Sequence, residues 1–235
     1  MAFTDSPTQD AELRAALAAY PAAALPHVLI LAAGRGERFL ASGGASHKLQ
    51  AEVAPGISVL QATLAAVQAS GLPWHLERGP HPGMGDSIAA AVKATPDAHG
   101  WLILPADLPL IAPASLQTIA LTLLGHRPAG AVEDVEAQGQ CRQASLMEGD
   151  ATGLRVVQPQ WQGQSGHPVA FSKAAFASLI QLAGDKGAAS IVRQAAQQSS
   201  LMQIALQDEG TVLDVDTVPL LERARQLWLQ RSARA

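Results

Sequence analysis

The chain has 235 residues, enough to bury one sizeable core. Its balance of 48% hydrophobic against 15% charged residues is typical of globular rather than disordered proteins. A formal net charge of -4 provides no basic surface for nucleic acid, although a local cationic pocket for a small charged substrate is compatible with it. The single cysteine, Cys141, excludes an internal disulfide framework and fits a reducing compartment.

One uncharged stretch, Ala15–Gly34, has to be weighed as a signal or membrane segment. Acidic residues such as Asp5 and Asp10 precede it, where a signal peptide needs net positive charge. Pro21 and Pro26 interrupt it as a helix. We therefore expect a soluble, cytoplasmic protein that has no membrane partner.

Short apolar runs that end in glycine, proline or polar turn residues predict the strands. Val28–Leu31 and Trp101–Leu104 are apolar throughout, as expected of strands buried on both faces of a parallel sheet. The other expected strands are 74–77, 130–135, 143–147, 169–171 and 212–215. The second and third of these are expected to pair antiparallel.

Helices are expected between the strands, where apolar residues recur with helical spacing. Ser70 and Gly71 would end one helix, and Asp86 and Ser87 would cap the start of the next. The expected helices are 11–20, 58–69, 88–94, 113–124, 173–182, 187–197 and 219–230. Strands that alternate with helices predict an α/β fold: a three-layer α/β/α sandwich around a Rossmann-like, mostly parallel mixed sheet.

No linker or repeat divides the sequence. We therefore expect residues 1–235 to form one domain, with an N-terminal helical extension at 1–26 and a C-terminal helix and tail at 221–235.

A glycine-rich turn, Gly34-Arg35-Gly36, follows the first buried strand. Glycine lets the backbone approach a ligand closely, and free N–H groups at the start of the next helix point toward a bound anion. Arg35, Arg38 and Lys48 would add charge-assisted contacts. Taken alone, the pattern fits a phosphate-binding loop and an ordinary strand-to-helix turn equally well.

Two common nucleotide motifs fit this turn less well. A dinucleotide fingerprint needs a third glycine or alanine, where this chain has Phe39. A Walker A loop needs Gly-Lys-Ser/Thr, which is absent. A dehydrogenase is therefore the least favoured class of enzyme.

The segment Leu31–Phe39 (Leu-Ala-Ala-Gly-Arg-Gly-Glu-Arg-Phe), followed by Lys48, resembles the opening motif of the MobA/MocA-like nucleotidyltransferases. Its branch most similar to this chain is that of the molybdenum cofactor cytidylyltransferases. The resemblance implies the nucleotide-diphospho-sugar transferase type of fold and a loop that wraps a triphosphate. It implies that Arg38 and Lys48 contact this triphosphate and that Ala33 favours CTP over GTP. The implied nucleotide-binding residues of this loop are Leu31, Ala32, Ala33, Gly34, Arg35 and Gly36.

Four further segments match the same family in order, up to about Leu221. The turn Gly83-Met84-Gly85-Asp86-Ser87 resembles one near the base and ribose, which implies nucleotide contacts from Gly83, Met84, Gly85 and Ser87. The paired elements Gly166-His167-Pro168 and Gly184–Ala188 resemble the acceptor side, which implies acceptor contacts from His167 and Asp185. Without the resemblance, an acceptor contact and a turn histidine that bonds to the backbone are equally good interpretations of His167.

The acidic segments of the resemblance imply a metal site. Leu104–Pro109 resembles the strand end that holds the metal, and 214–217 resembles the closing motif. The resemblance therefore implies Asp107 and Asp216 as Mg²⁺ ligands, with Asp214 evenly balanced between ligand and bystander. Asp107 also fits a turn-forming aspartate between prolines. Together with Arg38 and Lys48, Asp107 is the implied catalytic group.

The implied reaction is attack by the acceptor's terminal phosphate on the α-phosphorus of CTP or another nucleoside triphosphate, with release of pyrophosphate. A phosphate nucleophile is already ionised near neutral pH, so the site must supply alignment and charge neutralisation rather than a general base. The resemblance implies Mg²⁺ as cofactor and a molybdopterin-type acceptor.

Two alternatives stay open beside this reading, and the first of them is motivated by a departure from the family. Between Gly71 and Gly83 the chain has room for one short strand, where the family has a strand and a helix. A non-catalytic protein that binds the cofactor and matures a molybdoenzyme partner is therefore one alternative. A nucleotidyltransferase for sugar phosphates is the other.

Overall fold

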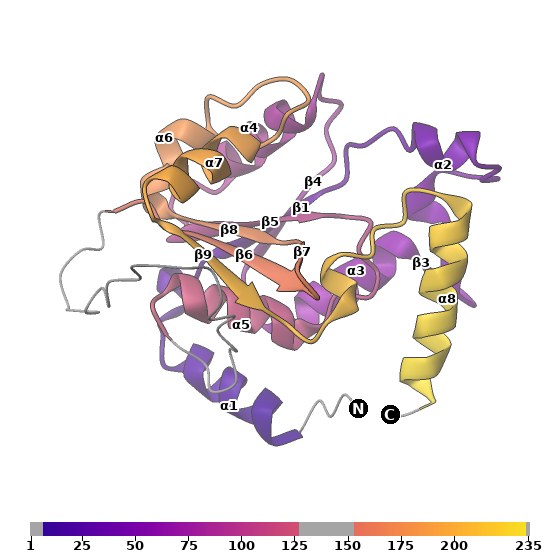
Figure 1. Ribbon diagram of the computed structural model, residues 1–235, viewed down its shortest axis with the longest axis horizontal. Helices are drawn as coiled ribbons and strands as arrows, with labels where there is room; N and C mark the ends of the chain where they lie inside the picture. The colour runs from indigo at the N-terminus through magenta and orange to yellow at the C-terminus, as the bar shows by residue number, and fades with distance from the viewer. Residues whose placement is uncertain (1–6, 127–152, 234–235) are drawn as a thin grey trace.

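The computed structural model describes residues 7–126 and 153–233, which form a mixed sheet between layers of helices (Figure 1). The strands of the seven-stranded sheet are β1 (His27–Leu31), β4 (Trp74–Glu77), β5 (Gly100–Pro105), β6 (Val156–Trp161), β7 (Gln164–Ser165), β8 (Val169–Ser172) and β9 (Leu201–Ala205). Their order is β4-β1-β5-β8-β6-β7, with β9 paired to β6. A separate antiparallel pair joins β2 (Glu52–Ala54) to β3 (Ile57–Ser58).

The helices cover both faces of the sheet, which confirms the predicted three-layer α/β/α class. They are α1 (Pro7–Ala18), α2 (Glu37–Ala41), α3 (Val59–Ser70), α4 (Met84–Ala94), α5 (Pro113–Leu123), α6 (Phe176–Leu179), α7 (Ala189–Gln197) and α8 (Val218–Ser232). Short 3₁₀ turns are η1 (Ala22–Ala24), η2 (Lys48–Gln50), η3 (Lys173–Ala175) and η4 (Glu209–Thr211). Figure 1 shows α4, α6 and α7 over one face, with α1, α3 and α5 over the other. None of the described helices is long and apolar enough to cross a lipid bilayer.

The central strands β1 and β5 divide the core into two parts. Successive side chains of a strand point to opposite faces. Leu102 and Leu104 therefore pack with α1, α3 and α5, whereas Trp101 and Ile103 pack with α4, α6 and α7. Burial of both faces explains why these two strands are the ones that are apolar throughout.

The parallel strands place two of the predicted site segments at one edge of the sheet. β1 pairs in parallel with both β4 and β5, and Leu31 lies opposite Glu77 on one side and Pro105 on the other. The carboxyl ends of these strands therefore meet, and the glycine-rich loop and Asp107 leave the sheet side by side. Ligands of open α/β sheets bind at this edge.

The shortened segment between Gly71 and Gly83 still supports a complete crossover. β4 occupies an edge of the sheet beside β1, and α4 then leads directly into β5. The β4–α4–β5 connection is therefore intact despite the short segment.

The start of α4 differs from the prediction. The helix begins at Met84 with Gly83 as its N-cap residue, so Asp86 and Ser87 lie inside its first turn. The Asp86 carboxylate instead accepts a hydrogen bond from the backbone N–H of Gly184 at 2.8 Å. The Asp86 side chain, which we expected to cap the helix, therefore bonds to a residue that is distant in the sequence.

The expected strand at 212–215 is wrong, because this segment leaves η4 as extended chain outside the sheet. Leu213 and Val215 are nevertheless buried, and the N–H of Val215 donates to the backbone C=O of Asp107 at 2.9 Å. Alternating apolar residues are thus buried in the core here without forming the backbone hydrogen bonds of a strand.

The β2–β3 pair was not expected, and further differences lie in the second half of the chain. β6 and β9 were not expected, since their polar residues hide the strand pattern. The expected helix at 173–182 is divided into η3 and α6, and α7 begins two residues later than expected. The strands expected at 130–135 and 143–147 lie outside the described residues.

Candidate active site

The glycine-rich loop runs from Ala32 to Gly36, between β1 and α2. Gly36 is the N-cap residue of α2 and has φ of +68°, a left-handed conformation that favours glycine. A Cβ at Gly34 would meet nothing within 4 Å, so the backbone there faces open space. The loop therefore presents backbone that a ligand can approach closely.

His47 holds this loop, and the sequence reasoning missed it. Its Nδ1 accepts the backbone N–H of Leu49 at 3.3 Å, which places the ring proton on Nε2. The Nε2–H then donates to the backbone C=O of Gly34 at 2.8 Å. The same side chain thus links the loop to the turn that carries Lys48. Its only sequence signal is its position next to Lys48.

Three carboxylates gather at the sheet edge. Asp107 follows β5, whereas Asp214 and Asp216 follow η4, and one oxygen from each lies within 4.8 Å of the others. Asp107 is buried, and its Oδ1 has no hydrogen-bond partner among the described residues. A buried carboxylate oxygen without a donor is unusual in a native protein and marks a place where a cation would fit.

Two cations cross-link this acidic cluster. The Lys48 Nζ donates to Asp107 Oδ2 at 2.5 Å and to Asp216 Oδ1 at 2.6 Å. Arg38 donates to the other oxygen of Asp216 at 2.6 Å from an exposed position. The structure therefore joins the three residues that the resemblance assigned to catalysis, Arg38, Lys48 and Asp107, in one network through Asp216.

The charges in the network shift two pKa values. Burial by itself would lower the pKa of Lys48, but the Asp107 and Asp216 carboxylates outweigh it and raise this pKa above its ordinary value. Burial and then the negative charges of Asp107 and Asp216 raise the pKa of Asp214. Lys48 is thus held as a cation, and the Asp214 carboxyl is protonated more easily than an ordinary aspartate.

His167 connects the acidic cluster to a neighbouring cavity. It lies two residues before β8, and its backbone N–H donates to the C=O of Thr211 at 2.8 Å. His167 is exposed and lines a recess. Surrounding protein atoms lower the pKa of the imidazole through desolvation, and the nearby charge of Asp107 opposes this effect. His167 is therefore held toward its neutral form.

The glycines at the start of α4 pack against the other predicted ligand segment. A Cβ on Gly83 would lie 2.4 Å from the backbone carbon of Gly184, and one on Gly85 would lie 2.8 Å from the backbone of Ala183. The N–H of Gly85 donates to the C=O of Gly184 at 2.7 Å. The absence of a side chain at Gly83 and Gly85 thus allows the start of α4 to pack directly against the backbone at 183–184.

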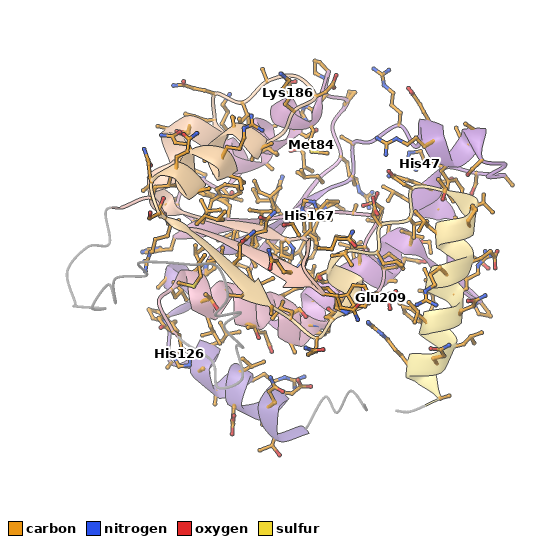
Figure 2. All side chains as sticks on the ribbon, viewed as in Figure 1. His47, Met84, His126, His167, Lys186 and Glu209 are labelled. Carbon is orange, nitrogen blue, oxygen red and sulfur yellow. The ribbon has the colours of Figure 1, made fainter. Side chains whose placement is uncertain are left out.

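The remaining predicted ligand residues differ in exposure. Ser87 is buried and its hydroxyl donates to Gly83, whereas Met84 is exposed beside Gly187. Asp185 is exposed on the loop before α7, away from the acidic cluster. Figure 2 shows Met84 between Lys186, near the outer edge, and His167, near the sheet.

Comparison with known proteins identifies the class. The model of the MobA-like NTP transferase domain matches residues 61–200, which is more than half of the chain. The chain therefore belongs to the MobA-like NTP transferase family, and it is a nucleotidyltransferase of this type. The matched span includes Asp107 and His167 but leaves out the glycine-rich loop, Lys48 and Asp216, whose assembly is seen only in the structure. No curated protein matches the chain.

Solved structures share the fold at low sequence identity. Rv0371c of Mycobacterium tuberculosis H37Rv is 22% identical with a TM-score of 0.60, covering 86% of this chain and 97% of that one. Its complex with manganese gives 21% identity, a TM-score of 0.57, and coverage of 86% and 98%. Mth528 of Methanothermobacter thermautotroptrophicus, described as a nucleotidyl transferase, is 17% identical with a TM-score of 0.64. The match covers 88% of this chain and 99% of that one.

Proposed function

We propose that this protein transfers a nucleotidyl group, CMP in preference, from a nucleoside triphosphate to the phosphate of a molybdopterin-type acceptor, with Mg²⁺ as cofactor. One observation carries the proposal: Lys48, which follows the glycine-rich loop, bonds to both Asp107 and Asp216. A triphosphate-binding loop and an acidic metal site thus share a single side chain.

The triphosphate would lie along Ala32–Gly36, where the open backbone at Gly34 allows close approach. Arg38 and Lys48 carry the positive charge that a triphosphate needs. Both already point at the acidic cluster, so the phosphates would enter between cations that the protein has positioned. Ala33 supports the preference for cytidine through the motif alone.

The residues of the acidic cluster fit a hard divalent cation. Asp107 and Asp216 would hold it, and Asp214 supplies a third carboxylate within reach. The unpartnered Oδ1 of Asp107 and the manganese bound by Rv0371c support a divalent metal here. When bound, the cation would neutralise charge on the reacting phosphates.

The chain's own groups have the remaining tasks. The acceptor phosphate is ionised near neutral pH, so Arg38 and Lys48 would orient and screen the two phosphates rather than move protons. His167 and Asp185 would contact the acceptor. The non-catalytic alternative was motivated by the short 71–83 segment. Because β4 and α4 still complete the crossover to β5, we favour the catalytic function.

A thermal-shift panel of CTP, GTP, ATP and UTP, each with and without Mg²⁺, tests the proposal. We expect Mg²⁺ with CTP to raise the melting temperature most, because only a ligand that binds the folded state stabilises it. Equal shifts with all four nucleotides would remove the cytidine preference. No shift with any of them would contradict the nucleotide site itself.

A further inference from the structure

A cavity of about 350 Å³ is lined by residues of the sheet and of the helices α4 and α7, and by His167. This volume is in the range of small-molecule sites. Its walls are mostly apolar: Ile88 from α4, Ile103 from β5, and Val169 and Phe171 from β8. Such walls favour a planar or hydrocarbon body and offer few partners to the hydroxyls of a sugar.

Positive charge is concentrated at one side of this cavity. Lys186, on the loop before α7, and Arg193, one turn into α7, both line it and are both exposed. Gly187, Ala188 and Ala189 complete this wall, so the first turn of a nine-residue helix faces the same space. Within this turn the N–H groups of Ala189 and Ile191 already donate to backbone C=O groups at 3.4 and 3.0 Å. The side chains of Lys186 and Arg193 therefore supply the main attraction for an anion, aided by the positive end of the helix dipole.

The other side of the cavity leads to the acidic cluster. His167 lines the cavity, and its imidazole lies near enough to Asp107 to sense the charge of that carboxylate. Met84 lies between Lys186 and His167 in Figure 2 and covers Gly187, so a flexible thioether forms the adaptable wall.

We propose that this cavity binds the body of the acceptor, and that the acceptor is planar or hydrocarbon-like and carries a second anionic group beside its phosphate. The inference rests on the proposed function for the phosphate end, which would point past His167 toward Asp107. The second anionic group would lie between Lys186 and Arg193. Sugar phosphates fit this arrangement poorly, since beside Lys186 and Arg193 the lining offers only Gln158 and His167 as polar side chains.

The test uses three probes that carry no phosphate, with the full-length chain and no nucleotide. 2-Naphthoate has a planar apolar body and an anion, 2-naphthol has the body alone, and glucuronate has an anion on a polar body. By titration calorimetry we expect 2-naphthoate to bind about tenfold more tightly than 2-naphthol, as one charge-assisted contact provides. Glucuronate should not bind measurably.

Variants locate the site. The double substitution Lys186→Ala/Arg193→Ala should reduce 2-naphthoate binding to the level of 2-naphthol and leave 2-naphthol unchanged. Ala189→Trp should block both probes, because this exposed residue lines the cavity. Lys93→Ala removes an exposed lysine of α4 that does not line the cavity, and it should change neither affinity. Circular dichroism and melting temperature confirm that each variant is folded.

Three outcomes would overturn the inference: equal affinity for 2-naphthoate and 2-naphthol, equal affinity of wild type and double variant, or unchanged binding in Ala189→Trp. Displacement of 2-naphthoate by CTP with Mg²⁺ would also overturn it, because the cavity would then belong to the nucleotide. Failure of the proposed function looks different: 2-naphthoate binds as expected while no nucleotide raises the melting temperature.

Discussion

The two halves of the candidate site are built in opposite ways. On the nucleotide side, Arg38, Lys48, Asp107 and Asp216 form a continuous network of ion pairs at the sheet edge. On the cavity side, apolar side chains form the walls and two cations stand at one margin. Electrostatics therefore organises the first half, whereas shape organises the second. Substitutions in the first half should change chemistry more than stability, and substitutions in the second should do the reverse.

The largest effect is expected at Asp107. Asp107→Asn keeps the shape but removes the buried charge that faces Lys48 and would face the metal. We expect pyrophosphate release with Mg²⁺, CTP and acceptor to fall on the order of a thousandfold, comparable to the loss of a central electrostatic group. Asp97→Asn, an exposed aspartate after α4, is the matched control and should retain full activity. Similar activity of both variants would mean that Asp107 serves only the turn.

Lys48 comes next, because it bonds to both proposed metal ligands, Asp107 and Asp216. Lys48→Met should lower kcat/KM about a hundredfold by removing one charge from the network. It should also leave Asp107 and Asp216 without their shared cation, so Mg²⁺ alone should raise the melting temperature more in the variant than in wild type. Differential scanning fluorimetry measures this. A smaller shift in the variant would show that Lys48 supports metal binding.

Two glycines contrast a tightly packed position with an open one. Gly83→Ala places a Cβ 2.4 Å from the backbone of Gly184, so α4 or the following loop must move. We expect a loss of about 2 kcal/mol in the free energy of unfolding, measured by urea denaturation, as overpacking typically costs. Gly34→Ala is the counterpart: its Cβ meets nothing within 4 Å, so stability should be kept while nucleotide affinity falls. Equal losses of stability in the two variants would contradict the difference in packing between Gly83 and Gly34.

The smallest effect concerns pH and His167. Desolvation lowers the pKa of His167 in the folded state, so the unfolded chain binds a proton more readily as the pH falls below the ordinary value of 6.5. The folded state loses stability in this range, and above it His167 is neutral in both states. His167→Gln should remove about two degrees of the decrease in melting temperature between pH 7.5 and 5.5.

His99→Gln, which changes an exposed histidine before β5, is the control and should leave this decrease unchanged. A steeper pH dependence in His167→Gln would show that the charge of Asp107 outweighs desolvation.

The order of elements was largely predictable from local patterns. The central strands β1 and β5, the helices α3 and α5, and the loop between β1 and α2 were expected from apolar runs, caps and glycines. These signals are short-range, so they survive wherever burial is strong. They failed at β6 and β9, whose polar residues hide the strand pattern, and at 212–215, whose buried apolar residues imitate a strand.

The sequence by itself determined which chemistry was available: a glycine-rich loop, cations behind it, and acids at or near the ends of expected strands. Only the tertiary structure decided which of these groups meet. Lys48 bonds to Asp107 and Asp216 across separations of 59 and 168 residues, and His47 holds Gly34 without any motif to announce it. The cavity likewise exists only because α4, α7 and three strands converge on it. Local patterns cannot encode such contacts, since these depend on how the strands are ordered in the sheet and not on neighbouring residues.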